Sequence, residues 1–336
     1  MSSIGVAGSG GWGTAMAVLL SNSGHDVTLW SYFKEESEAL SKNHENKLLP
    51  GVKIPDSVKF TNNISDCAGC EIIIIAVPSH TVRQTCKSLA PYVSDGQIIV
   101  NISKGFDEGT YLRLSETIRE EIPNARVLVM SGPSHAEEVG RGMPTTNVIA
   151  NEDHDLAVYV QKIFMTEKFR IYTNTDVIGV ELGGALKNVI AICVGICDGL
   201  GYGDNTKAAL MTRGMAEIVR LGTAMGANMR TFAGLSGIGD LIVTCTSMHS
   251  RNRRAGILIG KGETAAQARA EVGMVVEGIK TCDAAHHLAK KYNVDMPIVN
   301  EAYKVLFENK PAGDAVWDLM CRSEKREDDY YYEKNN

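Results

Sequence analysis

The sequence predicts a two-domain α/β protein, with a doubly wound parallel sheet of the Rossmann type in residues 1–185 and an all-helical domain in residues 186–336. Three observations predict this fold. The apolar run at residues 4–7 turns through several glycines and continues as an apolar helix. Continuous β-branched runs at residues 71–77, 97–102 and 126–130 are typical of strands covered on both faces. From Glu181 onward, apolar residues recur at helical spacing instead.

Length and composition limit the class of protein. A chain of 336 residues is long for one domain and comfortable for two. The chain is 44% hydrophobic and 22% charged with a net charge of −6, so it offers no basic surface for nucleic acid or an anionic membrane. No uninterrupted apolar stretch is long enough for a membrane span, and no basic segment marks a secretory signal. We therefore expect a cytoplasmic protein.

The N-terminal glycines form a dinucleotide-binding fingerprint in the strand, turn and helix context that it needs. Gly8 permits the tight turn, Gly10 lets the backbone approach a pyrophosphate, and Gly13 lets the helix pack against its strand. The phosphates would then lie over free N–H groups at the start of the helix. The first domain is therefore expected to bind a nicotinamide dinucleotide.

The end of the second expected strand, residues 25–30, bears on which dinucleotide binds. Enzymes selective for NAD carry an Asp or Glu here, which would repel a 2′-phosphate. This chain has Lys34 and no carboxylate at the strand end, which predicts that NADP(H) is accepted and preferred. The alternative is a solvated Lys34 whose field is partly cancelled by Glu35 and Glu36, in which case both NAD(H) and NADP(H) bind.

Two later strands end in loops that carry functional groups at the ligand-binding edge of such a sheet. Lys104 follows residues 97–102, although a surface lysine is the commoner fate of this residue type. The loop at 131–137 supplies hydroxyl and backbone donors; its His135 is assigned no catalytic role. The segment at 34–63 is polar and is expected to be a helix followed by a loop.

In the helical half, Lys187 is the one cation in the small and apolar segment 181–192. Such a lysine either snorkels to water or has its pKa lowered by desolvation and by a nearby cation. If Lys104 faces it across the cleft between the domains, Lys187 could exchange a proton near neutral pH. Asp240 ends the glycine-rich segment 234–239, where it either caps the next helix or orients Lys187. The run 249–254 concentrates three guanidinium groups suited to a phosphorylated substrate or to the cofactor's 2′-phosphate; taken alone, such a run would be a solvated face.

The eight cysteines give no metal site. Cys67 and Cys70 have Cys-x-x-Cys spacing, but no second pair or paired histidines complete a zinc set, and they precede a strand instead of opening a helix. We interpret them as loop cysteines. The charged segment from Ser323, followed by the tyrosines at 330–332, is expected to be a solvated end.

Seven motifs together resemble one family, the NAD(P)-dependent sn-glycerol-3-phosphate dehydrogenases of bacterial type. They occur in the family's order between Gly8 and Glu277. They are Gly-x-Gly-x-Trp-Gly-Thr-Ala (8–15), Ser-Lys-Gly (103–105), Gly-Pro-Ser-x-Ala-x-Glu (132–138), Gly-Ala-Leu-Lys-Asn (184–188), Gly-x-Gly-Asp-Leu (237–241), Ser-Arg-Asn (250–252) and Val-Val-Glu-Gly (275–278). The resemblance implies a helical second domain of the 6-phosphogluconate-dehydrogenase-like kind.

The resemblance also implies roles, carried over residue by residue. Lys187 would be the proton acceptor, with Lys104, Asn188, Asp240 and Thr244 around the reacting carbon. Contacts to the phosphorylated substrate would come from Lys104, Gly132, Ser134, Lys187, Asp240, Ser250, Arg251 and Asn252. Cofactor contacts would come from Gly8, Gly10, Gly11, Trp12, Gly13, Lys34, Lys104, Ala136, Arg251, Val275 and Glu277.

The expected activity is reversible hydride transfer between NAD(P)H and dihydroxyacetone phosphate, which gives sn-glycerol 3-phosphate for glycerophospholipid synthesis. One lysine can serve both directions, as acid in reduction and as base in oxidation. Two alternatives remain: a reductase of another small keto acid on the same fold, and a non-catalytic NADP(H) sensor. The apolar helices also allow a homodimer.

Overall fold

The computed structural model describes residues 1–327, and the chain divides into two compact units. The first unit is Met1–Glu181, and the second begins at Leu182. The boundary falls inside helix α8 (Val177–Gly199), slightly before residue 185. The tyrosines at 330–332 lie outside the described residues; the preceding segment 323–327 is exposed to solvent.

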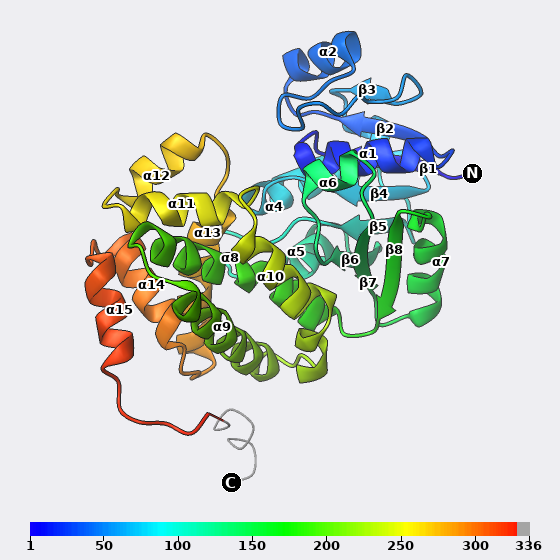
Figure 1. Ribbon diagram of the computed structural model, residues 1–336. Coiled ribbons are helices and arrows are strands. Elements are labelled where there is room, and N and C mark those ends of the chain that lie inside the picture. Colours follow the sequence, from blue (N-terminus) through cyan, green and yellow to red (C-terminus); the bar gives the residue numbers. More distant parts are fainter. Residues whose placement is uncertain (328–336) are drawn as a thin grey trace. The chain divides into compact units, whose positions relative to one another are not determined.

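The first unit is built on one eight-stranded sheet with the order β3-β2-β1-β4-β5-β6-β7-β8 (Figure 1). Strands β1 to β6 are parallel, whereas β7 is antiparallel to β6 and parallel to β8. The predicted doubly wound sheet is thus confirmed. The strands are β1 (Ser3–Ala7), β2 (Asp26–Trp30), β3 (Lys59–Thr61), β4 (Ile72–Ile75), β5 (Ile98–Asn101), β6 (Arg126–Ser131), β7 (Thr145–Ala150) and β8 (Phe169–Asn174).

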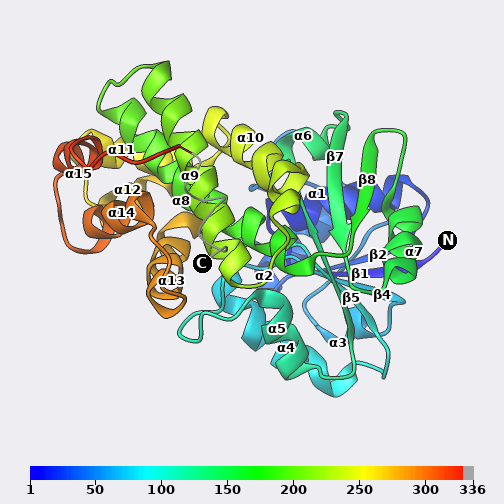
Figure 2. The ribbon, with the colours of Figure 1, turned by 90° about the horizontal axis from the view of Figure 1, so that it is seen from below.

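Both faces of this sheet are covered, as the continuous β-branched strands require. Ile72 and Ile74 of β4 lie in one apolar core, and Ile73 and Ile75 lie in the other. Figure 2 shows α3, α4 and α5 on one side of the sheet and α1 and α6 on the other. The helices of this unit are α1 (Gly11–Asn22), α2 (Lys34–Asn43), α3 (Ser65–Ala68), α4 (Val82–Leu89), α5 (Leu114–Glu121), α6 (Ala136–Gly140) and α7 (His154–Phe164), with 3-10 turns η1 (Ser79–Thr81) and η2 (Ala90–Tyr92).

Three strands were not predicted from the sequence. The segment 34–63 contains the expected helix α2, but its last part pairs with β2 as strand β3 instead of remaining a loop. Strands β7 and β8 were also not predicted, because each contains polar residues and neither is a continuous apolar run. In β8, which is an edge strand, buried and exposed residues alternate at first, which indicates that one face of the strand packs on the core and the other faces water.

The topology places the glycine-rich turn where open α/β sheets bind ligands. The strand order reverses between β1 and β4, and ligands of such sheets bind outside the carboxyl ends of the strands at this point. The turn after β1 is fixed there by the N–H of Gly8, which donates to the carbonyl of Trp30 at the end of β2 (3.1 Å). The loops that follow β4, β5 and β6 emerge at the same edge.

The described part of the second unit is helical, as predicted (Figure 1). The residues 181–192 lie within the longer helix α8. The other elements are α9 (Asp204–Ala224), η3 (Met229–Ala233), the π-helical turn η4 (Leu235–Gly239), α10 (Asp240–Thr246), α11 (Arg251–Gly260), α12 (Ala265–Val272), α13 (Glu277–Lys291), α14 (Pro297–Phe307) and α15 (Ala312–Met320).

Helix α8 is the one described helix that is long and apolar enough to cross a membrane. Its most apolar 18-residue window is 89% buried within the protein. Such burial is typical of the core helix of a folded domain, because protein side chains take the place that lipid would have. We therefore interpret α8 as a core helix.

Cys67 and Cys70, the Cys-x-x-Cys pair, are buried and form no disulfide. Cys67 lies in the short helix α3 and not in a loop, so that part of the interpretation was wrong. Both thiols are buried, and burial raises the pKa of Cys67 and of Cys70. A raised pKa disfavours the thiolate, which is the form that binds metals and reacts with disulfides.

Candidate active site

The glycine-rich turn has the shape that a pyrophosphate needs. Gly8 has φ +128°, and a Cβ on it would lie 2.5 Å from the carbonyl oxygen of Ala76. A Cβ on Gly13 would lie 2.0 Å from the carbonyl oxygen of Gly8. In contrast, no heavy atom lies within 4 Å of the Cβ position of Gly10. Packing therefore requires a glycine at positions 8 and 13. The backbone at Gly10 is open to a ligand at the start of α1.

Asn46 holds this turn, and no motif in the sequence points to it. Its buried amide nitrogen donates to the carbonyl oxygen of Ser9 (2.7 Å) and to the hydroxyl of Thr14 (2.6 Å). Asn46 lies in an irregular segment after α2, far from the glycines in sequence. It fixes the loop from outside the motif.

Three residues assigned to the cofactor lie together beside the turn. The Cβ position of Gly11 lies 3.6 Å from the Cβ of Ala136, the first residue of α6. Trp12 and Ala136 are both partly buried against the apolar core on this side of the sheet. The structure thus brings the 8–13 segment and the start of α6 into one neighbourhood.

Lys34 begins α2, shortly after β2 ends. Its side chain is largely exposed and lies 3.7 Å from Glu38, one helical turn further on. Glu38 and not Glu35 or Glu36 is therefore the nearby carboxylate. An exposed pair of this kind is weak, so Lys34 can exchange Glu38 for another anion.

Lys104 bridges two of the loops at the carboxyl edge of the sheet. Its ammonium donates to the carbonyl oxygen of Gly132 (3.1 Å) and to the hydroxyl of Ser134 (2.9 Å). The side chain is half-buried, so Lys104 is not the surface lysine of the alternative interpretation. Gly132 has φ +137°, which lets the chain turn sharply after β6.

The second unit pairs Lys187 with Asp240. The Lys187 ammonium donates to the carboxylate of Asp240 and to the hydroxyl of Thr244 (2.6 Å). The side chains of Lys187 and Asp240 are only 7% and 1% exposed. Asp240 and Thr244 share one face of α10, because they lie four residues apart. Asp240 does not cap α10: the N-cap position is Gly239.

A close approach of backbones makes this pairing possible. A Cβ on Gly183 would lie 2.6 Å from the carbonyl oxygen of Ser236 in η4. Only glycine lets η4 pack so tightly on α8, and α10 follows η4 without interruption. Lys187 lies one helical turn beyond Gly183 on α8.

A chain of amide hydrogen bonds joins three of the family motifs. The side-chain nitrogen of Asn252 donates to the side-chain oxygen of Asn188 (2.9 Å). The N–H of Gly278 in turn donates to the side-chain oxygen of Asn252 (2.8 Å). Glu277 begins α13 next to Gly278, and Val275 precedes it in the connecting segment. The structure thus gathers residues 188, 252 and 275–278 beside α11.

One of the three guanidinium groups of residues 249–254, that of Arg253, is held by partners of its own. Arg253 pairs with Asp198 (2.8 Å) and donates to the carbonyl oxygen of Thr246 (2.6 Å). Residues 251 and 253 point to different sides of α11, since residues two apart on a helix do not face each other. Arg253 therefore has a structural role, and the part of the expectation that counted Arg253 among the phosphate-binding guanidiniums was wrong. Ser250 is the N-cap of α11, and its hydroxyl accepts from the N–H of Arg253 (3.2 Å).

The described residues thus form two sets with different chemistry. In the first unit, the glycine turn, Lys34, Lys104, Ser134 and Ala136 surround the carboxyl edge of the sheet. In the second unit, a buried ammonium held by a carboxylate lies on α8, and the N-terminus of α11 presents N–H groups suited to an anion. The first set suits a dinucleotide, and the second suits proton transfer and phosphate binding.

Comparisons with known proteins agree with both sets. Residues 3–157 match the model of the NAD-dependent glycerol-3-phosphate dehydrogenase N-terminus, and residues 176–317 match that of the C-terminus. A glycerol-3-phosphate dehydrogenase (NAD(P)+) of Fusobacterium nucleatum subsp. nucleatum is 54% identical over 331 residues, covering 97% of this chain and 99% of the relative. One of Desulfitobacterium hafniense is 52% identical over 328 residues, covering 97% and 93%.

Solved structures show the same similarity. The crystal structure of glycerol-3-phosphate dehydrogenase from Coxiella burnetii has a TM-score of 0.92 and 34% identity, covering 96% of this chain and 99% of that one. A ketopantoate reductase from Ralstonia eutropha JMP134, at 14% identity and a TM-score of 0.52, shares the fold alone. The chain belongs to the NAD-dependent glycerol-3-phosphate dehydrogenase family.

Proposed function

We propose that this enzyme reduces dihydroxyacetone phosphate to sn-glycerol 3-phosphate with NAD(P)H, and catalyses the reverse oxidation. The observation that carries the proposal is the buried Lys187, held by Asp240 and Thr244 in the unit that also presents the N-terminus of α11. A proton donor and a phosphate-binding helix end are what a phosphorylated ketone requires. The bound nicotinamide cofactor supplies the hydride.

Lys187 moves the proton. The carboxylate of Asp240 favours its ammonium form, which donates a proton to the ketone oxygen as negative charge develops there. In the reverse direction the neutral amine accepts the hydroxyl proton. Asp240 and Thr244 fix the direction of the ammonium, and Asn188 is itself held by Asn252. We assign Lys104 to polarise the same oxygen.

The substrate phosphate binds at the start of α11 in this proposal. Ser250 is the N-cap of that helix and Arg251 and Asn252 are its first residues, where backbone N–H groups and the helix dipole favour an anion. Arg251 adds a guanidinium, and Gly132 and Ser134 complete the proposed contacts. Binding a phosphate that does not react positions the carbonyl carbon for hydride transfer.

The cofactor is held by residues 8–13 and Ala136, with Arg251, Val275 and Glu277 as further proposed contacts. Lys34 lies after β2 without a carboxylate at the strand end, so we propose that NADP(H) is accepted and preferred. Steady-state kinetics with NADPH and NADH, in wild type and Lys34→Glu, test this. The substitution should lower kcat/KM for NADPH and leave that for NADH nearly unchanged.

The test of the reaction is consumption of NADPH with dihydroxyacetone phosphate, followed by the absorbance of the reduced nicotinamide. Pantoate precursors and other 2-keto acids serve as controls for the alternative reductase. We further propose that the enzyme is cytoplasmic, acts as a homodimer, and supplies glycerophospholipid synthesis. Size-exclusion chromatography with light scattering tests the dimer.

A further inference from the structure

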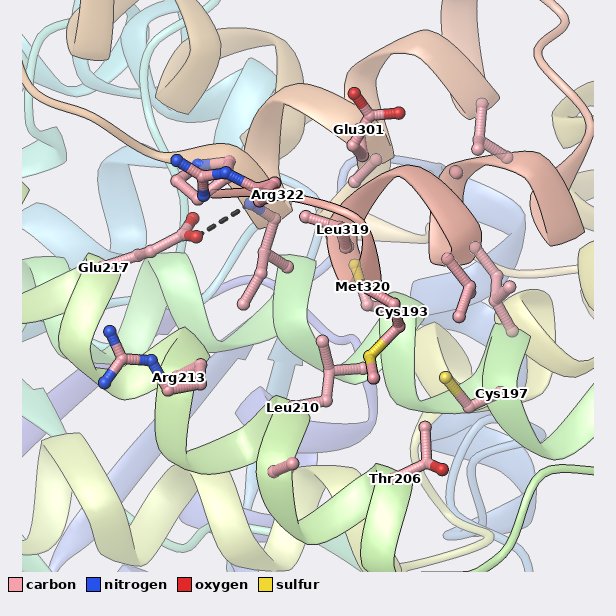
Figure 3. Close-up of a pocket in the computed structure, with 18 of the residues that line it drawn as sticks. Cys193, Cys197, Thr206, Leu210, Arg213, Glu217, Glu301, Leu319, Met320 and Arg322 are labelled. Atoms are coloured by element: carbon pink, nitrogen blue, oxygen red, sulfur yellow. Dashed lines mark hydrogen bonds between the residues drawn. The ribbon is translucent and has the colours of Figure 1, made fainter. Parts of the chain in front are cut away.

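The second unit contains a cavity of about 800 Å³ that none of the residues assigned to the reaction lines (Figure 3). Its walls come from α8, α9, α14 and α15, from Asp295 before α14 and from the segment 322–326 after α15, all within this unit. Leu210, Leu319 and other apolar side chains supply most of the lining. Sites for small organic ligands have volumes of about 300–1,000 Å³ and mainly apolar walls with a few polar groups. The cavity fits this description.

The carboxylates that line the cavity are already satisfied. Asp295 pairs with Arg322 (3.0 Å) and Lys325 (2.9 Å). Glu301 pairs with Lys304 and Lys310, which lie outside the lining.

The third carboxylate, Glu217, is buried on α9. It accepts hydrogen bonds from the N–H groups of Ile298 (2.7 Å) and Val299 (3.1 Å) at the start of α14. Figure 3 shows Glu217 one helical turn from Arg213 on the same helix. No lining carboxylate therefore needs a cationic ligand.

Two lining guanidinium groups donate hydrogen bonds to backbone carbonyls and not to carboxylates. Arg213 and Arg220 lie two turns apart on one face of α9 and are half-buried. Their side chains donate to the backbone carbonyls of Glu327 (3.3 Å) and Asp295 (3.0 Å). Neither forms an ion pair within 4.0 Å with a described residue, although Arg220 lies close enough to the buried Glu217 to lower the pKa of that carboxyl. A carbonyl does not neutralise a guanidinium charge, so Arg213 brings a positive charge to this side of the cavity, and Arg220 adds a second one that Glu217 partly offsets.

We propose that the cavity binds a small amphipathic organic anion, whose apolar body packs against α8, α14 and α15 and whose carboxylate, sulfonate or phosphate group is held by Arg213 and Arg220. Guanidinium forks bind planar and tetrahedral oxyanions with two parallel hydrogen bonds. A cation of the same shape would meet uncompensated positive charge. Because α8 also carries Lys187, a ligand bound here contacts the helix that holds the catalytic lysine.

The direct test compares two fluorescent probes that differ by one charged group. 8-Anilinonaphthalene-1-sulfonate carries a sulfonate on an apolar aromatic body, and N-phenyl-1-naphthylamine is the same body without it. Titrations are made on the full chain with saturating NADP+, which blocks the nucleotide site. We expect one site per chain, and binding of the sulfonate about tenfold or more tighter than of the neutral probe. Equal affinities would overturn the proposal.

Matched variants locate the site. Arg213→Met should weaken sulfonate binding about tenfold and leave the neutral probe unchanged, whereas Arg230→Met, an exposed arginine outside the cavity, should change neither. Ala209→Phe places a ring in the cavity from an exposed position and should abolish binding of both probes. Circular dichroism confirms that each variant is folded.

Two results would contradict the assignment. Full binding by Ala209→Phe would place the probes elsewhere. A change from dimer to monomer in the same variant, with no loss of probe binding, would show that a second copy of the chain covers the cavity. The assay needs no turnover, so its failure leaves the proposed reaction untouched.

Discussion

Lys187 and Asp240 lie 53 residues apart in the chain and form an ion pair buried in the second unit. Burying two charges is costly unless they are paired and further hydrogen-bonded, and Thr244 supplies one further hydrogen bond. Burial of this pair thus costs folding free energy, and the pair holds the ammonium of Lys187 in a fixed direction. This is the arrangement expected of a proton donor.

Breaking the pair from one side should be strongly destabilising. Lys187→Met or Asp240→Leu leaves an uncompensated buried charge, and each should lower the free energy of unfolding by about 3–5 kcal/mol. The double variant should lose less than the sum of the two, because no charge remains unpaired. Urea unfolding of all four proteins measures the coupling. Additive losses would mean that the two charges do not interact in solution.

The glycine turn allows stability and nucleotide binding to be separated. Gly10→Ala puts a methyl group into open space at a φ of −61° that alanine adopts, so the fold should be retained. The same methyl group would meet the pyrophosphate, and the Kd for NADPH should rise about tenfold or more. Fluorescence titration measures this.

Gly13→Ala should behave differently, because its Cβ would lie 2.0 Å from the carbonyl oxygen of Gly8. Overpacking of this kind costs about 1–3 kcal/mol. We expect a lower midpoint of thermal unfolding in Gly13→Ala and an unchanged one in Gly10→Ala. The opposite order would contradict the described turn.

Substitutions of Arg251 and Arg253 should change different quantities, KM for the first and stability for the second. Arg251→Met should raise KM for dihydroxyacetone phosphate about tenfold or more, through loss of a charged hydrogen bond, with little change in stability. Arg253→Met removes the pair with Asp198 and should lower the free energy of unfolding by about 1–2 kcal/mol, with KM nearly unchanged. A rise in KM for both variants would show that Arg253 also binds the substrate phosphate, which would contradict its structural role.

The buried Glu217 should make stability depend on pH. Burial raises its pKa from 4.5 to about 7, while two N–H donors and Arg220 act in the opposite direction. Between these pH values the folded state holds a proton that the unfolded state has released. The contribution of Glu217 to the free energy of unfolding is therefore complete below pH 4.5. It falls by about 3 kcal/mol as the pH rises toward about 7.

Glu217→Gln is the matched control for this dependence. Glutamine keeps one acceptor oxygen, so it retains only one of the two hydrogen bonds from the N–H groups of Ile298 and Val299, and it does not titrate. Urea unfolding at several values between pH 4.5 and 7.5 should show a slope in wild type that the variant lacks. Identical slopes would assign the pH dependence to other groups.

The fold was predictable where the sequence pattern has one physical cause. The run at Ile72–Ile75 is apolar on both faces because both faces are covered, and it was recognised as a strand. The edge strand Phe169–Asn174 alternates polar and apolar residues and was missed. Strand β3 has only three residues, which is too short for a pattern.

The site was predictable at the level of motifs but not of side-chain partners. The motifs contain Lys187, Asp240, Asn188 and Asn252, and the structure supplies the bonds that join them. The run of arginines did not predict the position of Arg253, because residues that are close in sequence lie on different sides of a helix. Asn46 could not be found, since its role depends on a contact between segments far apart in the chain.

The most direct test of the central claim is NADPH oxidation by dihydroxyacetone phosphate, measured for wild type and Lys187→Ala. Turnover in wild type should fall about 10²–10⁴-fold in the variant, the range for loss of a general acid, while NADPH still binds. Turnover that survives in a folded Lys187→Ala protein would contradict the assignment of Lys187. A folded wild type that oxidises neither NADPH nor NADH with this substrate would contradict the proposed reaction.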